Sequence, residues 1–97
     1  MTAIDATVTL GQRATPTDEI LMQYLGDETI LLDLKSEHYF GLNTVGSRIW
    51  ALLPEATNLA TVLDALCGEF DAPRERIEAD LLTLIGSLRK AGLITVA

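Results

Sequence analysis

The sequence predicts one α+β domain in which a short antiparallel sheet is followed by three helices. Between residues 20 and 42, apolar side chains recur every second residue in short runs, which is the period of a β-strand. From residue 44 onwards they recur every three or four residues, as in amphipathic helices. A chain of 97 residues with 48% apolar composition can bury one modest core. We therefore expect a single domain over residues 19–97, preceded by an irregular arm over residues 1–18.

Three strands are expected before the first helix. Gly26 and Asp27 supply turn residues between the first two strands, and a group of polar residues separates the second strand from the third. Such short connections make neighbouring strands antiparallel. The third strand then lies at an edge of the sheet, and an open edge is either protected or used to bind another strand. The expected strands are residues 20–25, 29–34 and 39–42.

Side chains alternate between the two faces of a strand, which places the residues around the second turn. Tyr39 has the opposite parity to Phe40 and Leu42. If these two residues face the helices, the Tyr39 ring lies on the outer face of the sheet. Asp33 has the opposite parity to Leu32, and we expect it to share the outer face with Tyr39.

Capping residues and prolines mark the ends of the helices. Asn43 is a suitable N-cap for a first helix, which Pro54 ends. Thr57 or Asn58 can cap the second helix, and Gly92 suits the left-handed residue that follows the third. The expected helices are residues 44–53, 59–70 and 73–91, followed by a short extended tail at residues 93–96.

The third helix carries more apolar surface than one core stripe needs. At about 100° per residue, one face forms a core stripe, which comprises Ile77, Leu81, Leu84 and Leu88. A flank of this stripe holds further apolar and charged residues, namely Glu78, Leu82, Ile85 and Arg89. Two interpretations are open. Either Ile85 borders the core and Leu82 packs under the N-terminal arm, or this flank is one wall of a groove beside the edge strand.

Charge and composition exclude several classes of function. Fourteen acidic and seven basic residues give a net charge of −7, which disfavours binding to nucleic acids and to anionic membranes. No stretch reads as a transmembrane span or a signal peptide. The single cysteine, Cys67, excludes an internal disulfide framework and fits a reducing compartment. We expect a soluble, cytoplasmic protein.

Residue types that carry catalysis are scarce. His38 is the one histidine and falls in a predicted turn, where an imidazole is usually only solvated. Cys67 lies near the apolar face of the second helix, where a thiol usually acts as a small core residue. No glycine-rich phosphate loop and no helical pair of metal ligands is recognisable. We expect no enzymatic activity, no metal and no cofactor.

A set of short motifs extends over residues 18–96: Leu31-Leu32-Asp33-Leu34, Tyr39-Phe40-Gly41-Leu42-Asn43, Val45-Gly46, Ile49-Trp50, Leu52-Leu53, Ala79-Asp80-Leu81-Leu82 and Gly92-Leu93-Ile94. Together these motifs resemble the PqqD-like family. Its members are RiPP recognition elements, small domains that bind the leader of a ribosomally made precursor peptide and present it to modifying enzymes. The chain is most similar to the stand-alone members found with lasso-peptide maturation enzymes. It lacks the Pro-Glu-Gly turn of the members that serve pyrroloquinoline quinone synthesis.

The resemblance implies a winged helix-turn-helix-like fold, in which the leader adds as a strand beside residues 38–42 and lies against the helix at 73–91. It implies two partners, the precursor leader peptide and a maturation enzyme such as a leader peptidase or cyclase. Carried onto this chain, the peptide-binding residues are Leu31, Asp33, His38, Tyr39, Phe40, Arg74, Glu78, Leu82, Ile85 and Arg89.

Two other functions are open from the sequence. A small sheet with three helices is also the architecture of winged-helix DNA-binding proteins, whose third helix reads the DNA. Against this, the basic residues of the third helix project in four directions; they are Arg74, Arg76, Arg89 and Lys90. Alternatively, the open edge can pair with a second copy in a dimerising structural module. We expect a monomer or a weak, strand-swapped dimer.

Overall fold

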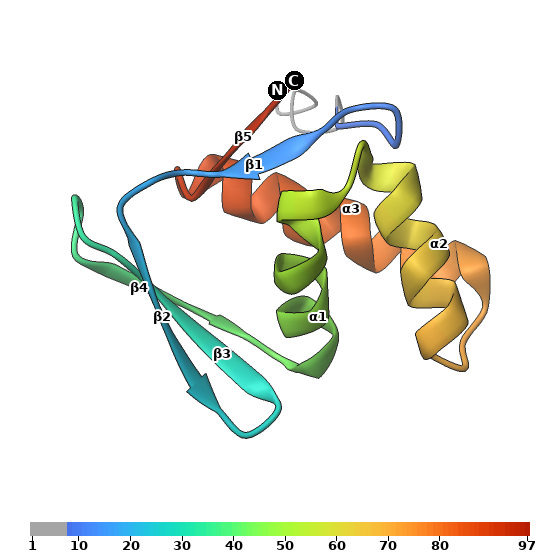
Figure 1. Ribbon diagram of the computed structural model, residues 1–97, viewed down its shortest axis with the longest axis horizontal. Helices are drawn as coiled ribbons and strands as arrows, with labels where there is room; N and C mark the ends of the chain where they lie inside the picture. The colour runs from blue at the N-terminus through green and yellow to red at the C-terminus, as the bar shows by residue number, and fades with distance from the viewer. Residues whose placement is uncertain (1–7) are drawn as a thin grey trace.

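A three-stranded antiparallel sheet projects to one side of a three-helix unit in the computed structural model, which describes residues 8–97 (Figure 1). The elements are β1 (Ala14–Pro16), β2 (Ile20–Leu25), β3 (Glu28–Asp33), β4 (His38–Leu42), α1 (Thr44–Leu52), the 3-10 helix η2 (Leu53–Glu55), α2 (Leu59–Glu69), α3 (Arg74–Lys90) and β5 (Ile94–Val96). The expected fold class, a sheet of three strands followed by three helices, is confirmed.

The strand order in this sheet is β2-β3-β4, so that β4 lies at one edge and β2 at the other. Leu32 lies between Leu21 and Tyr39, and Asp33 pairs with His38. Tyr39 is 74% exposed and Leu42 is 4% exposed, as the alternation predicted. The prediction for Asp33 is wrong, because its pairing with His38 puts it on the parity of Phe40 and not on that of Tyr39.

The arm before β2 contains a strand that the sequence did not locate. β1 pairs antiparallel with β5, so that Thr15 lies opposite Thr95. Further along the arm, the carbonyls of Leu10 and Gln12 accept hydrogen bonds from backbone N–H groups at the start of α2, at 2.9 and 2.8 Å. These bonds fasten both ends of the described chain to the helices. The division at residue 18 stays a prediction, and residues 1–7 of the expected arm lie outside the described residues.

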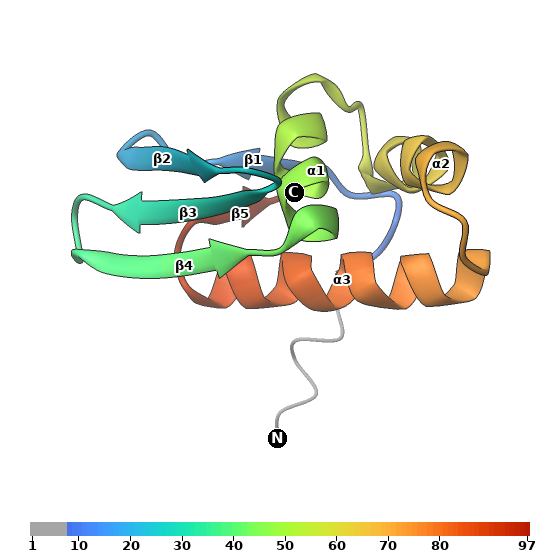
Figure 2. The ribbon, with the colours of Figure 1, turned by 90° about the horizontal axis from the view of Figure 1, so that it is seen from below.

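The core lies mainly among the three helices and extends under the inner face of the sheet. Figure 2 shows how the helices and the sheet are arranged. Its fully buried members come from every layer: Leu31, Ile49, Leu53, Leu59, Leu63, Leu66, Leu81, Ile85 and Leu88. Trp50 is buried as expected, and its Nε1–H donates to Sδ of Met22 at 2.9 Å, which joins α1 to β2. Among residues 8–97, no helix combines the length and the apolarity that crossing a bilayer requires.

The predicted capping residues Asn43, Asn58 and Gly92 are confirmed, and the helices are each one or two residues shorter than predicted. Asn43 Oδ1 accepts from the N–H of Gly46 at 2.8 Å at the start of α1, and Asn58 Oδ1 accepts from Thr61 at 3.0 Å at the start of α2. Gly92 follows α3 with φ +81°, which a side chain would disfavour. Because Asn43 caps α1 directly after β4, the edge strand and the first helix are joined by a single residue.

Candidate functional site: the edge of β4 and the groove beside α3

The hydrogen-bonding pattern shows which backbone groups of β4 point outward. Leu34 donates its N–H to the carbonyl of Glu19 at 2.9 Å, one step beyond the pair of Ile20 with Asp33. Bonded and non-bonded pairs alternate in an antiparallel ladder, and this bond flanks a non-bonded pair. The backbone groups of Asp33 therefore face β4, where they meet His38.

The direction of the backbone N–H and C=O groups alternates along β4, so the direction at His38 fixes it for the rest of the strand. Phe40 and Leu42 share the parity of His38, so their N–H and C=O groups also face β3. Tyr39 and Gly41 point theirs outward, and no segment of residues 8–97 pairs with this side of the strand. The edge therefore offers two donors and two acceptors in a row, at the spacing that an added strand requires.

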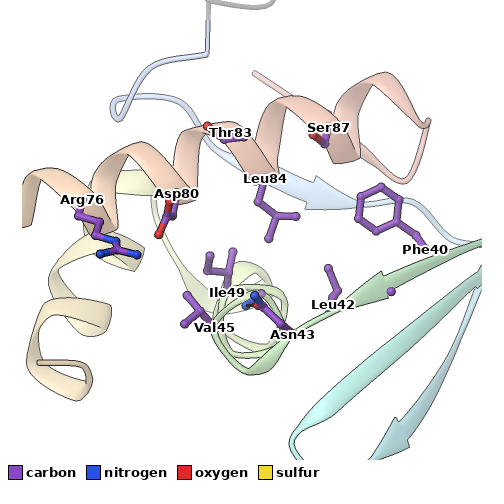
Figure 3. Close-up of a pocket in the computed structure, with 12 residues that line it drawn as sticks. Phe40, Leu42, Asn43, Val45, Ile49, Arg76, Asp80, Thr83, Leu84 and Ser87 are labelled. Atoms are coloured by element: carbon purple, nitrogen blue, oxygen red, sulfur yellow. Dashed lines mark hydrogen bonds between the residues drawn. The ribbon is translucent and has the colours of Figure 1, made fainter. Parts of the chain in front are cut away.

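A groove of about 590 Å³ runs beside this edge, between β4, the start of α1 and one face of α3 (Figure 3). Its apolar side chains point toward one another from all three elements; they are Phe40, Leu42, Val45, Ile49 and Leu84. Its polar side chains are Asn43, Arg76, Asp80, Thr83 and Ser87. In the close-up, Phe40 and Ser87 mark one end of the groove, and Arg76 and Asp80 mark the other.

The charged end continues into a second, smaller hollow of about 260 Å³. Val45, Arg76 and Asp80 belong to both hollows, and Phe70 and Ala72 extend the lining toward the α2–α3 connection. The groove is thus apolar beside the strand edge, and it carries one charge of each sign farther along α3.

Comparison with known proteins places this geometry in a family. Residues 28–94 match the family model described as Coenzyme PQQ synthesis protein D (PqqD). The chain belongs to the PqqD family. The match runs from the start of β3 to the first residue of β5 and so includes every element that lines the groove.

Two solved structures are similar to this PqqD-family chain. One is TbiB1 in complex with the TbiA(beta) leader peptide, at 36% identity and a TM-score of 0.75, covering 82% of this chain and 93% of that one. The other is lasso peptide synthetase B1 complexed with the leader peptide, at 26% identity and a TM-score of 0.75, covering 86% of this chain and 98% of that one. No curated protein matches the sequence. The expected likeness to lasso-peptide members of the family is confirmed.

The wall that α3 contributes differs from the wall that the sequence predicted. The buried stripe of α3 is Ile77, Leu81, Ile85 and Leu88. Leu84, which the sequence assigned to the core, is half-buried and lines the groove. At 100° per residue, the mean direction of the buried stripe is therefore turned by about 25° toward Ile85. The flank of α3 that faces β4 lies on the other side of this stripe from the predicted flank, and it carries polar residues outside the predicted set.

Two predicted contact residues are excluded from the surface. Ile85 and Leu31 both have 0% exposure, so neither side chain can touch a bound peptide in this structure. Ile85 packs in the core, in agreement with the first of the two interpretations of this flank. Leu31 lies opposite Phe40 in the sheet and supports that ring from within.

The remaining predicted residues of α3 lie away from the groove. Glu78, Leu82 and Arg89 are about half a turn around the axis from Asp80 and Ser87, and none of them lines the groove. Arg74 pairs with Asp64 on α2 at 3.0 Å, and this hydrogen bond raises the pKa of its guanidinium. The groove has its own basic residue, Arg76. Only its position on the helix could have suggested it, because charged residues are common on both flanks of α3.

Asp33 and His38 lie where the β3–β4 hairpin turns. The Asp33 carboxylate accepts from the Lys35 N–H and from the Ser36 hydroxyl, both at 3.0 Å, and these bonds lower its pKa. Asp33 therefore holds the turn. His38 is exposed at the first position of β4, and Phe40 is the predicted residue that lines the groove.

Among the described residues, the metal-binding and thiol–imidazole groups considered from the sequence do not come together at this site. In the part of the chain that the structure describes, no three His, Cys, Asp or Glu side chains are placed to hold a metal ion. His38 belongs to β4 and Cys67 to α2, and these elements lie on opposite sides of α1 in both views (Figures 1 and 2). The site consists of an open strand edge, the apolar groove beside it, and two charged side chains, Arg76 and Asp80.

Proposed function

We propose that this PqqD-family protein is a non-catalytic peptide-binding protein of RiPP biosynthesis. It captures the leader of a ribosomally made precursor as an extra strand antiparallel to β4, and it delivers that leader to a maturation enzyme such as a leader peptidase or cyclase. The open edge at Tyr39 and Gly41, directly beside an apolar groove, is the observation that carries the proposal. The two leader-bound structures that the chain resembles support it.

The hydrogen bonds of strand addition contribute about as much free energy as the ordering of the leader costs. Tyr39 and Gly41 offer four outward groups, and four hydrogen bonds at about 0.5–1.5 kcal/mol each contribute about 2–6 kcal/mol. Ordering a flexible peptide costs about 2–5 kcal/mol. Because these hydrogen bonds are also blind to sequence, both affinity and selectivity must come from side chains.

The groove supplies the side-chain contacts. Every second residue of an added strand points to the helix side, and these residues are about 7 Å apart. An apolar leader side chain there meets Phe40, Leu42 and Leu84. Burying it contributes about 1.5–3 kcal/mol, so two or three anchors contribute about 3–9 kcal/mol. The upper end corresponds to a Kd of about 0.3 micromolar.

Charged leader residues have a place at the far end of the groove. Arg76 and Asp80 line both hollows there, so a leader acid meets Arg76 and a leader base meets Asp80. Glu78, Leu82 and Arg89 would contact only a part of the leader that passes around α3. The structure does not favour the DNA-binding alternative. Arg74 is paired with Asp64, and Arg76 lies beside Asp80 in the groove, so an acidic residue accompanies each of these two basic residues.

A titration of fluorescently labelled leader peptide against two leucine variants tests the proposal. Leu84 and Leu82 are both half-buried on α3, and only Leu84 lines the groove. We expect Leu84→Asp to weaken leader binding at least tenfold because it puts a charge against the apolar anchors. Leu82→Asp should change it less than threefold. Equal losses in two variants with native circular dichroism, or a loss in Leu82→Asp alone, would remove the groove as the binding site.

A further inference from the structure

We propose that the outer face of the β2-β3-β4 sheet docks the maturation enzyme while the leader occupies the β4 edge. This inference rests on the proposed function and adds a second, separate surface to it. The partner surface that fits is an apolar patch bordered by lysine and arginine side chains.

The outer face is apolar where a solvated face should be polar. The register puts Leu21, Leu32 and Tyr39 in one row across all three strands, and Leu25 and Ile30 lie on the same side. Leu21, Leu25 and Tyr39 are 54%, 55% and 74% exposed. An antiparallel sheet with one buried face usually alternates apolar and polar residues, so that water meets polar side chains. Exposed apolar residues gathered on one face indicate a binding surface.

Acidic residues lie at both ends of the strands of this sheet. They are Asp27 and Glu28 at the β2–β3 turn, and Asp18, Glu19 and Glu37 at the opposite end; all five are exposed. Glu28 lies opposite Leu25 and so belongs to the outer face itself. Lys35 is the one basic residue in these turns.

The charges decide between possible occupants. A second copy of this chain, docked face to face, would bring carboxylates against carboxylates, and like charges in contact cost several kcal/mol. An anionic membrane is disfavoured for the same reason. A different protein with a basic border gains attraction instead, together with burial of the row formed by Leu21, Leu32 and Tyr39.

Docking on this face leaves the leader site open. The groove lies on the opposite side of the sheet, among Phe40, Leu42 and the helices, so an enzyme on the outer face does not cover it. Half of the side chains of an added strand point to the outer side, next to Tyr39. They enlarge the docking face, so an enzyme placed there contacts the loaded leader directly. We expect it to bind more tightly when the leader is present.

The experiment takes a purified leader peptidase as the maturation enzyme of the proposed function and measures its binding to immobilised full-length protein with leader peptide present. Leu21→Ser and Leu25→Ser alter the outer face. Tyr24→Ser is the matched control, because Tyr24 is 65% exposed on the same strand but on the other face. We expect each leucine variant to weaken peptidase binding at least tenfold, the control less than threefold, and leader binding to change less than twofold in all three.

A charge reversal tests the border separately. Glu28→Lys should weaken peptidase binding and reduce its salt dependence, whereas Glu55→Lys on η2, equally exposed, should do neither. Unchanged peptidase binding in Leu21→Ser and Leu25→Ser, or no peptidase binding by a wild-type protein that binds leader, overturns the inference. Dimers that form in gel filtration and disappear in Leu21→Ser would assign the face to a second copy and also overturn it. Loss of leader binding by the wild type would instead refute the proposed function.

Discussion

Replacing Gly41 by proline tests strand addition at the level of a single backbone group. The Gly41 N–H points away from β3, so the ladder of the sheet does not use it. A Cβ at this position would meet no atom within 4 Å, and proline is tolerated on the outer side of an edge strand. The free protein should therefore keep its fold.

Gly41→Pro should weaken leader binding strongly. Proline removes one of the two outward donors of β4 and leaves a leader carbonyl without its partner in a partly dehydrated edge. Such an unsatisfied group costs about 1–3 kcal/mol, which corresponds to a Kd raised about five- to 150-fold. Isothermal titration of the leader into Gly41→Pro measures this directly.

Phe40→Pro is the companion variant. The Phe40 N–H faces β3, opposite Leu31, so proline at this position breaks the sheet itself. We expect Phe40→Pro to lower the urea midpoint and Gly41→Pro to leave it nearly unchanged. A folded Gly41→Pro protein that binds the leader as the wild type does would refute the addition of a strand at this edge.

Two further variants test the account of the fold. Ile85→Ala should lower the free energy of unfolding by about 2–5 kcal/mol, because Ile85 is fully buried. The leader affinity of the folded variant should stay within threefold of the wild type. A large loss of affinity in a folded variant would show that Ile85 contacts the leader after all. Asp33→Asn should make the urea midpoint depend less on pH in the acidic range. The pKa of Asp33 is lowered in the folded protein, so its contribution is present above the unfolded value of about 3.9 and is lost as the pH falls through the folded value. Urea midpoints from pH 6 to pH 2 that fall in parallel for wild type and Asp33→Asn would contradict this.

Local signals in the sequence were enough for the order of the elements. Asn43, Asn58 and Gly92 each act at a helix end through their own side chain or backbone, so their roles can be read without tertiary contacts. The exposed edge also followed, since only short turns connect β2, β3 and β4.

The faces of the elements were harder to assign. Ile30, Leu31 and Leu32 are consecutive, so apolarity cannot say which of them is buried; the packing of the helices selects Leu31. Leu84 and Ile85 pose the same problem on α3, because either completes a stripe with Leu81 and Leu88. The packing of α3 against α1, α2 and β5 buries Ile85 and leaves Leu84 on the flank that faces β4. Three-residue strands such as β1 and β5 carry too few side chains to show a period.

Amide hydrogen exchange, read residue by residue with and without leader peptide, tests the central claim most directly. We predict that the amides of Tyr39 and Gly41 exchange much more slowly once the leader is bound. The amides of Met22 and Tyr24, on β2 at the other edge of the sheet, should keep their rates. Slower exchange at Met22 and Tyr24 with no change at Tyr39 and Gly41 would contradict it.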